Sequence, residues 1–434
     1  MHVGKRILRT ALITGSALGL TVGGSVLALA SGPAAQAATT CAAAWSAATV
    51  YTGGEQASEN GINYTANWWT QGNDPATNNG GSGSGQPWTS NGACTGGGSS
   101  GGGGSSGGGG SSGGGGTGSA SGLLFSPYKD VTINMNWNTY QMQSAVEGSS
   151  IPVVGSGSLV SNYVPKLPAI TLAFATGACG SETWGGAPGA NWAAENVPQL
   201  NSAGLNYVVS TGGEAGTFTC TSAAGMEAFI ARYASPHLVG IDFDIEGGQS
   251  ESDIQNLVSS AVGAQAQYPN LQFSFTLATL GASDGSYGGV NSLGNEVVEA
   301  VLGSSLKKYV INLMTMDFGS ASSSVCVVVS GSCEMAQSAI QAVKNLEHTY
   351  GIAAGKIAVT PMIGLNDNTS ETFTAADVDT LTSYAASNSL AGLHYWSLDR
   401  DTPCNDSYAS PTCNSISGTT PLEYTNRFLS DLGI

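Results

Sequence analysis

The chain has 434 residues, of which 41% are hydrophobic and only 9% are charged. Its 12 lysines and arginines stand against 29 acidic residues, which gives a formal net charge of −17. This balance excludes the basic surface that nucleic acids and anionic membranes require, so we expect neither as a partner. The length indicates two or three domains.

The first 37 residues have the pattern of a secretory signal peptide. Three basic residues lie within the first ten positions, an apolar run follows at Ala11–Leu20, and Ala35-Gln36-Ala37 offers small residues at a cleavage site. The alternative is an uncleaved membrane anchor, but glycine and serine dilute the apolar run below the length of a membrane span. We therefore expect a secreted, extracellular protein that is not attached to a membrane after cleavage.

The eight cysteines agree with export, because an even number in a secreted chain is typical of disulfides. In sequence order they fall into neighbouring pairs. None forms Cys-x-x-Cys, and the four histidines show no metal-ligand spacing, so we expect neither a metal nor another cofactor. The cysteines are Cys41, Cys94, Cys179, Cys220, Cys326, Cys333, Cys404 and Cys413.

A low-complexity segment divides the chain. Residues 95–118 are glycine, serine and threonine only, so this segment has no apolar side chain to bury and is predicted to be a flexible linker. It separates a small domain at 38–94 from a large domain at 119–434. A tether of this kind raises the local concentration of one domain around the object that the other binds. We therefore expect both domains to act on the same material.

The small domain is short for an independent core, and we expect a disulfide between Cys41 and Cys94 to stabilise it. It is rich in aromatic residues, of which Trp45 and Trp88 are predicted to lie in its core. Exposed flat rings stack on the apolar faces of sugars, and three further aromatic residues are predicted to form such a platform. These are Tyr64, Trp68 and Trp69.

The segment Tyr-x-Ala-x-Trp-Trp-Thr-Gln-Gly at residues 64–72 is the most specific motif of this domain. With it, the domain resembles the carbohydrate-binding modules of families 5 and 12, which bind chitin. The resemblance implies chitin and N-acetylglucosamine oligomers as the partners of the protein, which we expect to be a monomer.

The large domain contains eight short runs of β-branched and apolar residues with helical patterns between them. This alternation is typical of a parallel sheet with helices outside, and eight repeats predict an α/β fold of the (β/α)8 TIM-barrel class. The predicted strands are 130–137, 169–177, 206–213, 238–246, 272–280, 309–318, 357–367 and 392–399. The predicted helices include 224–233, 251–267, 335–350 and 375–387.

Catalytic residues of such barrels come from the C-terminal ends of strands, and the fourth predicted strand ends in three alternating acids. Asp242, Asp244 and Glu246 lie two residues apart, so their side chains point to one face of the strand. Burying three like charges together raises the pKa of at least one of them, and such a group is a general acid at neutral pH. We therefore predict that these three residues are catalytic.

The motif Asp-x-Asp-x-Glu on a fourth strand resembles the signature of the family 18 glycoside hydrolases, the chitinases. Three further segments agree with that family in barrel order: Ser210-Thr211-Gly212-Gly213, Met314-Thr315-Met316-Asp317 and Trp396. The resemblance implies a retaining reaction in which the acetamido oxygen of the substrate attacks the anomeric carbon. This family is an exception to the usual pair of catalytic carboxylates.

The resemblance also implies a role for each residue. Glu246 would protonate the leaving oxygen and then act as a base, Asp244 would orient the acetamido group, and Asp242 would hold Asp244 and share a proton with it. Met316 stands where the family usually has a tyrosine that donates a hydrogen bond to the acetamido oxygen, and a thioether cannot donate. The expected substrate-binding residues are Asp317, Met314, Met316, Trp396, Ser210 and, at the end of the first predicted strand, Trp137.

The connection between the last two predicted strands is short. Only 24 residues join them, from Asn368 to Ala391, which leaves no room for the inserted domain that walls the cleft in some family members. We therefore expect an open groove and cleavage of internal bonds, as in an endo-chitinase. Two alternatives stay open: an endo-β-N-acetylglucosaminidase that acts on N-glycans, and a non-catalytic, lectin-like chitin-binding protein.

Overall fold

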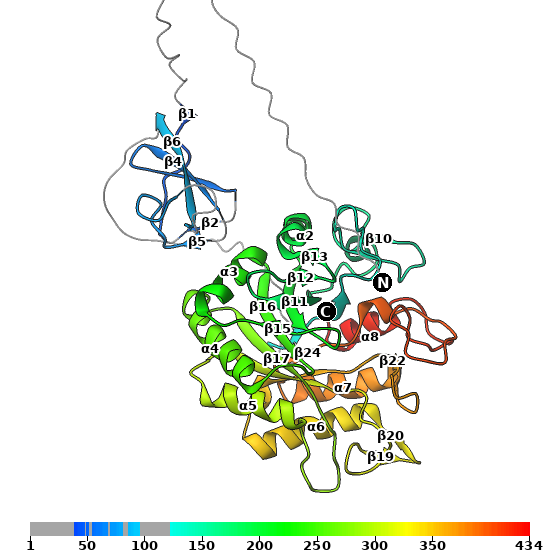
Figure 1. Cartoon of the computed structure of the whole chain (residues 1–434). Helices are drawn as coiled ribbons and strands as arrows, with labels where there is room; N and C mark the ends of the chain where they lie inside the picture. The colour runs from blue at the N-terminus through cyan, green and yellow to red at the C-terminus, as the bar shows by residue number, and fades with distance from the viewer. Residues whose placement is uncertain (1–38, 48, 52–53, 68–69, 81–85, 96–121) are drawn as a thin grey trace, which may run out of the picture.

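The structure is a computed structural model, and it describes residues 39–47, 49–51, 54–67, 70–80, 86–95 and 122–434. The predicted signal peptide and almost all of the predicted linker lie outside the described residues, and so do Trp68 and Trp69 of the predicted sugar platform. Figure 1 shows a small part built of strands and a large part built of strands and helices.

The small N-terminal part is a strand domain with a disulfide. Its main sheet has the order β1-β6-β4-β3, and β2 pairs with β5. The predicted disulfide between Cys41 and Cys94 is present and joins the start of the domain to its last strand. The strands are β1 (Thr39–Thr40), β2 (Val50–Tyr51), β3 (Gln56–Glu59), β4 (Ile62–Ala66), β5 (Thr70–Gln71) and β6 (Trp88–Thr95).

The aromatic core of this domain differs from the prediction at one residue. Trp88 is fully buried and Trp45 packs against the same cluster, as predicted. Tyr64, however, is only 3% exposed and belongs to that cluster, so its predicted place on an exposed platform is wrong. The reason is the alternation of side chains along β4, which puts Tyr64 on the same inward face as the buried Ala66.

The large part is built on a sheet of parallel strands. These follow the order β11-β14-β16-β17-β18-β21-β24-β7, and β8 pairs parallel with β11. The sheet is extended beyond β11 by β12, which is antiparallel to β11, and by β13, which is antiparallel to β12. The strands are β7 (Leu124–Phe125), β8 (Tyr128–Asp130), β11 (Ala169–Ala178), β12 (Thr183–Trp184), β13 (Ala187–Pro188), β14 (Asn206–Gly212), β15 (Phe218–Thr219), β16 (Leu238–Ile245), β17 (Gln272–Ala278), β18 (Tyr309–Met314), β21 (Ile357–Thr360) and β24 (Gly392–Leu393). Short two-stranded pairs lie outside it: β9 (Gln143–Ser144) with β10 (Ile151–Pro152), β19 (Val328–Val329) with β20 (Ser332–Cys333), and β22 (Gly364–Leu365) with β23 (Thr372–Phe373).

The ladder of the large sheet is not closed. Strand β7 pairs with β24, whereas β8, a separate strand, pairs with β11. A closed (β/α)8 barrel therefore stays a prediction. The last seven predicted strands correspond to β11, β14, β16, β17, β18, β21 and β24.

The first predicted strand, 130–137, is wrong. The strand is β8, which ends at Asp130, and turns follow it through Tyr140. The Asp130 carboxylate stabilises the turn that ends the strand. Its Oδ1 accepts hydrogen bonds from the Thr132 backbone N–H at 2.9 Å and from the Thr132 hydroxyl at 2.6 Å. Asn134 then adopts a left-handed conformation with φ +60°, which no strand can accommodate.

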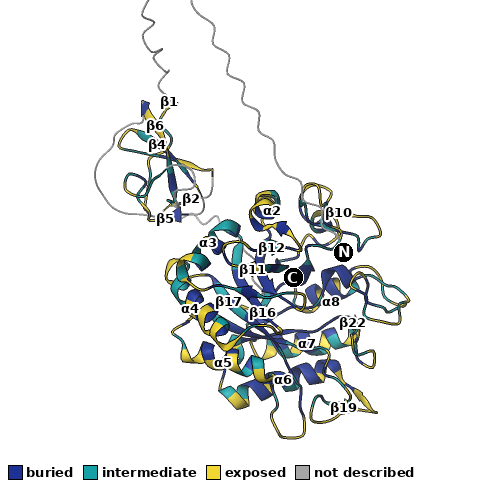
Figure 2. Cartoon of the chain, in the orientation of Figure 1, coloured by how far each residue is buried: buried dark blue, intermediate teal, exposed yellow. Residues whose placement is uncertain are grey.

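Helices lie around the sheet and cover it with their buried faces (Figure 2). The four predicted helices correspond to α3, α4, α6 and α7. Ser250 and Thr374 begin two of them as capping boxes, in which the cap residue and an acid three residues later satisfy each other's backbone N–H groups. The helices are α1 (Leu159–Asn162), α2 (Gly189–Ala203), α3 (Ala223–Tyr233), α4 (Glu251–Gln267), α5 (Ser292–Gly303), α6 (Met335–Tyr350), α7 (Ala375–Ser387) and α8 (Glu423–Asp431), with 3-10 turns η1 (Ala354–Lys356) and η2 (Leu398–Arg400).

Three further disulfides lie in the large part. Each joins cysteines that are neighbours in sequence order, as predicted: Cys179–Cys220, Cys326–Cys333 and Cys404–Cys413. Within the described part of the chain, no helix is both long enough and apolar enough to pass through a bilayer.

Candidate active site

A pocket of about 380 Å³ lies where several parallel strands of the large sheet end. Five of the side chains that line it are carboxylic acids, and none of the lining residues is a lysine or an arginine. It is therefore a pocket with an acidic wall and no built-in cation. It is lined by Tyr128, Phe174, Glu214, Asp244, Glu246, Thr276, Met314, Met316, Asp317, Thr360, Met362, Asp367 and Trp396.

The Ser-Thr-Gly-Gly motif lets β14 approach β16 closely beside this pocket. Gly212 pairs with Asp244 and has φ +89°. A Cβ atom at Gly212 would collide with the Asp244 carbonyl oxygen, so only glycine fits there. The chain then delivers Glu214 to the pocket wall.

Asp242 lies beneath the pocket and is almost fully buried. Its Oδ2 accepts hydrogen bonds from Ser210 Oγ at 2.6 Å and Tyr128 OH at 3.0 Å. Its Oδ1 accepts from Ser274 Oγ at 2.6 Å and Thr276 Oγ1 at 2.7 Å. Burial raises the pKa of Asp242, and these four hydroxyl donors partly offset that rise because they stabilise the anion.

Asp244 follows on the same face of β16 and lines the pocket. It is only 4% exposed, and its Oδ1 has no hydrogen-bond partner among the described residues. Burial, together with the charges of Glu246 and Asp242, raises the pKa of Asp244 well above its usual value. A buried oxygen without a donor is unfavourable, so this side of the pocket suits a ligand that brings an N–H or O–H group.

Glu246 is the outermost acid of the three and is open to solvent through the pocket. The surrounding protein still removes much of its hydration, and the negative charges of Glu214 and Asp317 lie nearby. These effects raise the pKa of Glu246 to about 7, although the Glu214 backbone N–H opposes the rise by donating to the carboxylate. At neutral pH this carboxyl group can both donate and accept a proton.

Aromatic rings and thioethers form the apolar side of the pocket. The Trp396 ring stacks on Phe174 with centroids 5.5 Å apart and an interplanar angle of 17°. The ring of Tyr128 also packs against Trp396, with the ring centroids 6.1 Å apart. Three methionines, Met314, Met316 and Met362, also line the pocket. Such a surface matches the apolar face of a sugar ring, while the acids match its polar groups.

The structure brings most of the predicted site residues together. Those that line the pocket are Asp244, Glu246, Met314, Met316, Asp317 and Trp396. Asp242 and Ser210 lie below it, joined by a hydrogen bond. Trp137 does not line the pocket and is 52% exposed in the turns after β8, because the observed strand ends seven residues earlier, at Asp130.

Several pocket residues received no role from the sequence. Tyr128 was missed because it precedes the misplaced first strand. Phe174 and Met362 lie inside the predicted strands 169–177 and 357–367, where an apolar side chain can equally pack in the core. Glu214 had a usable signal: it directly follows the glycine pair at the end of the third predicted strand, which is where pocket residues are expected.

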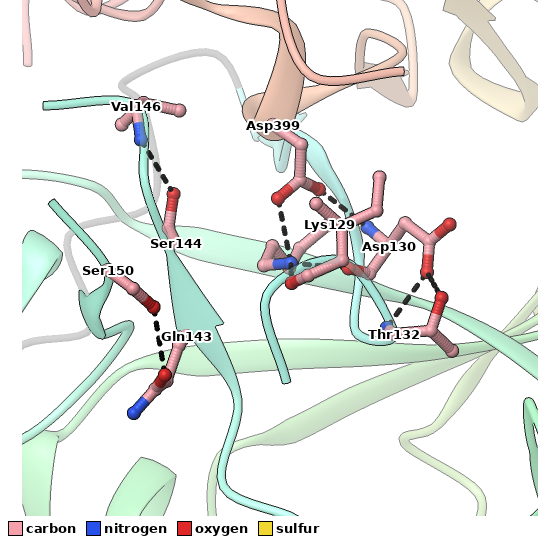
Figure 3. A network of polar contacts seen from close by, with 9 residues as sticks. Lys129, Asp130, Thr132, Gln143, Ser144, Val146, Ser150 and Asp399 are labelled. Carbon is pink, nitrogen blue, oxygen red and sulfur yellow. Dashed lines mark hydrogen bonds and ion pairs between the residues drawn. The ribbon is translucent and has the colours of Figure 1, made fainter. Parts of the chain in front are cut away.

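A buried ion pair fixes the strand that carries Tyr128. Lys129 and Asp399 are both buried, with Lys129 Nζ 2.7 Å from Asp399 Oδ1. Asp399 Oδ2 accepts the Asp130 backbone N–H at 3.0 Å, and Lys129 Nζ also donates to the Ile133 carbonyl at 3.0 Å. Figure 3 shows this network, which joins β8 to the η2 turn after β24. Burial raises the pKa of Asp399 to about 6, with Lys129 opposing the rise.

Comparison with known proteins finds similarity to both parts of the chain. Residues 44–89 match the model of carbohydrate-binding module family 5/12. A probable bifunctional chitinase/lysozyme of Escherichia coli (strain K12) is 25% identical over 433 residues, which cover 83% of this chain and 45% of that protein. The endoglucanase MaCel5A of Microbulbifer sp. (strain ALW1) is 43% identical over 53 residues, 12% of this chain and 10% of that protein. The chain thus spans less than half the length of each of these relatives.

The solved catalytic domain of a hyperthermophilic chitinase from Pyrococcus furiosus is similar in fold. Its TM-score is 0.55 at 22% identity, over 72% of this chain and 95% of that one. Residues 44–89 of the small part, which has its own disulfide, thus match a family 5/12 module, and the large part shares the fold of this solved catalytic domain.

Proposed function

We propose that the protein is a secreted chitinase that cleaves internal β-1,4 bonds between N-acetylglucosamine units. The observation that carries the proposal is the pair of acids at the end of β16, with Asp244 on the strand and Glu246 directly after it. Glu246 has its pKa raised to about 7, and the neighbouring Asp244 presents a buried oxygen that has no hydrogen-bond donor within the described ranges. An N-acetylglucosamine unit offers such a donor, the acetamido N–H, on the carbon next to the one that reacts.

The proposed reaction retains the β configuration. Glu246 protonates the oxygen of the glycosidic bond while the acetamido oxygen of the substrate attacks the anomeric carbon, so the bond to the leaving sugar breaks and an oxazolinium ion forms. Asp244 accepts the acetamido N–H and stabilises the positive ring, and Asp242 holds Asp244 and shares a proton with it. Glu246, now an anion, takes a proton from the water that opens the oxazolinium ring.

The apolar side of the pocket receives the sugar in this proposal. Trp396 stacks beneath the ring, and Met314 and Asp317 shape the subsite around the acetamido group. In the family 18 glycoside hydrolases, which this domain resembles, a tyrosine usually donates a hydrogen bond to the acetamido oxygen. Met316 stands at that position and cannot donate one. This absence is a reason to expect a slower chemical step.

We further propose that β7 and β8 together form the first strand of a closed (β/α)8 barrel. Their pairing with β24 and β11 supports this, because the two short strands reach both neighbours.

We also propose that the protein is exported and that residues 1–37 are cleaved from it. The four disulfides support it, since such bonds persist in oxidising compartments.

The family 5/12 module is proposed to hold the enzyme on insoluble chitin. Trp68 and Trp69 would stack on the sugar rings of the polymer, and residues 95–118 would tether the module, at 38–94, to the catalytic domain at 119–434. The tether keeps the pocket near its substrate after each cleavage, because it raises the local concentration of bonds to cut.

Hydrolysis of a soluble N-acetylglucosamine hexamer tests the proposed reaction. The wild type is expected to release mainly dimers and trimers, and Glu246→Gln to release none, because an amide cannot donate the required proton. Glu182→Gln is the control for the same substitution at another glutamate: Glu182 is buried and contacts Arg232 and Tyr233 outside the pocket. This control is expected to keep the product pattern.

Three outcomes would contradict the proposal in different ways. Turnover by Glu246→Gln at the wild-type rate would show that Glu246 is not the acid. Cleavage of N-glycans in place of the hexamer would favour an endo-β-N-acetylglucosaminidase. Binding of chitin with no hydrolysis of either substrate would favour a lectin-like protein.

A further inference from the structure

The backbone of Asp317 has an unusual conformation at the edge of the pocket. Its φ is +49°, in the left-handed region that residues other than glycine rarely adopt, and Gly319 has φ +98°. The Asp317 side chain lines the pocket, next to the end of β18. Because this conformation is unfavourable for an L-residue, it persists only where the surrounding structure holds it.

The carboxylate of Glu371 holds the turn at 317–319. Glu371 is fully buried, and its Oε2 accepts the Phe318 backbone N–H at 3.0 Å while its Oε1 accepts the Gly319 backbone N–H at 2.9 Å. These are the two peptide groups that directly follow Asp317. Fixing both of them fixes the direction in which the chain leaves Asp317.

Asn368 completes the contact from the same loop, which lies between β22 and β23. Its backbone N–H donates to Asp317 Oδ1 at 3.0 Å. Its side-chain amide donates to the Gly319 carbonyl at 2.6 Å and to Glu371 Oε1 at 2.8 Å. The loop therefore holds both the backbone and the carboxylate of Asp317.

The chemistry of the contact requires both oxygens of Glu371. Two adjacent N–H groups each need an acceptor, and a glutamine would direct its NH2 group at one of them. Glu371 forms none of the ion pairs found among the described residues. It does not line the pocket either, so its position suits neither charge pairing nor ligand contact.

We propose that Glu371 is a positioning residue of the active site, which holds the turn at 317–319 so that Asp317 keeps its carboxylate in the pocket. What Asp317 does there rests on the proposed function. That Glu371 positions it is independent of that function, and the two are tested separately.

A double-mutant cycle in the full-length protein tests the coupling. On the soluble hexamer, Glu371→Gln is expected to lower kcat about tenfold and to change KM much less, because it displaces a group around the reacting sugar. The double variant of Glu371→Gln with Asp317→Asn is expected to be no slower than Asp317→Asn alone, since both changes act through one carboxylate. Glu182→Gln is the control. In its double variant with Asp317→Asn, the fold reductions in kcat of the two single variants are expected to multiply. If the effect of Glu371→Gln multiplies in the same way, the proposal is overturned.

A crystal structure of Glu371→Gln separates positioning from activity. The expected result is that residue 317 leaves the left-handed region and that its contact with the Asn368 backbone N–H is lost. An Asp317 that keeps its φ and this contact would overturn the proposal, whatever the activity. A wild type that does not hydrolyse the hexamer, with Asp317 displaced in the variant, would refute the proposed function and leave the positioning role standing.

A second variant covers the case in which Glu371→Gln does not fold. Asn368→Ala removes the contacts of a less buried residue with the Gly319 carbonyl and Glu371. It is expected to displace Asp317 in the same direction and to lower kcat by a smaller factor. An unchanged Asp317 and an unchanged kcat in this variant would count against the proposal.

Discussion

Lys129 Nζ and Asp399 Oδ1 lie 2.7 Å apart and both side chains are buried, so water cannot hydrate either charge if the other is removed. Removing one member of such a pair leaves the other uncompensated. We expect Lys129→Met, which keeps the side-chain length but removes the charge, to lower the free energy of unfolding by about 3–5 kcal/mol. Urea denaturation followed by tryptophan fluorescence measures this loss.

An exposed ion pair serves as the control for this experiment. Arg427 and Asp379 are also paired, but both side chains are partly exposed. Arg427→Met is expected to cost less than about 1 kcal/mol. The double variant of Lys129→Met with Asp399→Asn should recover part of the loss, because no unpaired charge stays buried. Equal losses at the two pairs would contradict the role assigned to burial.

The stability of the protein is expected to fall as the pH rises from about 4 to about 7. Burial raises the pKa of Asp399 and of Asp401 to about 6 and that of Glu246 to about 7, whereas carboxyl groups of the unfolded chain titrate near 4. Between these values the folded state binds more protons than the unfolded state, so deprotonation favours unfolding. Thermal unfolding at pH 5 and at pH 7.5 measures the effect, and a higher midpoint at pH 7.5 would disprove it.

The charge of Glu214 is expected to set part of the pH profile of catalysis. A general acid must be protonated, so kcat/KM for the hexamer should fall as the pH rises through about 7. Glu214→Gln removes a negative charge beside Glu246, which lowers its pKa and moves this fall to lower pH. Glu251→Gln, outside the pocket at the start of α4, should leave the profile unchanged. A profile that does not move in Glu214→Gln would assign the raised pKa of Glu246 to burial and to the charge of Asp317.

Met316 offers a test of the missing hydrogen-bond donor. Met316→Tyr is expected to raise kcat, by no more than about 10²-fold, because it restores a hydroxyl toward the acetamido oxygen. Met316→Phe supplies the ring without the hydroxyl and is expected to give no gain. A lower kcat for Met316→Tyr than for the wild type would mean that another group already makes this hydrogen bond.

Substitution of two neighbouring tryptophans tests the proposed sugar platform of the module. Replacing Trp68 and Trp69 by alanine is expected to reduce binding to insoluble chitin by at least about tenfold, since each stacked ring contributes to affinity. Hydrolysis of the soluble hexamer should not change. Tyr64→Phe, in the buried core of the module, should leave binding intact, and a sedimentation assay with chitin compares the three. Wild-type binding by the tryptophan variant would exclude this platform.

The acids of the site were predictable because their signal is local. Asp242, Asp244 and Glu246 share a face through the period of a strand, and the strand itself is a continuous apolar run with acids at its end. The same reasoning located seven parallel strands. It failed at 130–137, where the turn-forming contacts of Asp130 outweigh the strand propensity of the residues that follow.

Other parts of the site have no local signal at all. Glu371 contacts backbone groups that lie 53 and 52 positions earlier in the chain, so its role depends on how two loops meet. Tyr64 sits in a motif typical of sugar-binding surfaces, yet the alternation along β4 directs its ring inward. Long-range packing decides the role of Glu371, which no short sequence window contains. For Tyr64, the strand that carries the motif decides which way the ring points.

The pairing of β8 with the η2 turn has a consequence for the order in which the protein is made. Asp130 and Asp399 are separated by 269 positions, so the early strand has no partner on this side until most of the domain has left the ribosome. Contacts of such long range form late and slow folding. A nascent chain that cannot complete its sheet early stays unfolded for longer, which would suit the export that we propose for this protein.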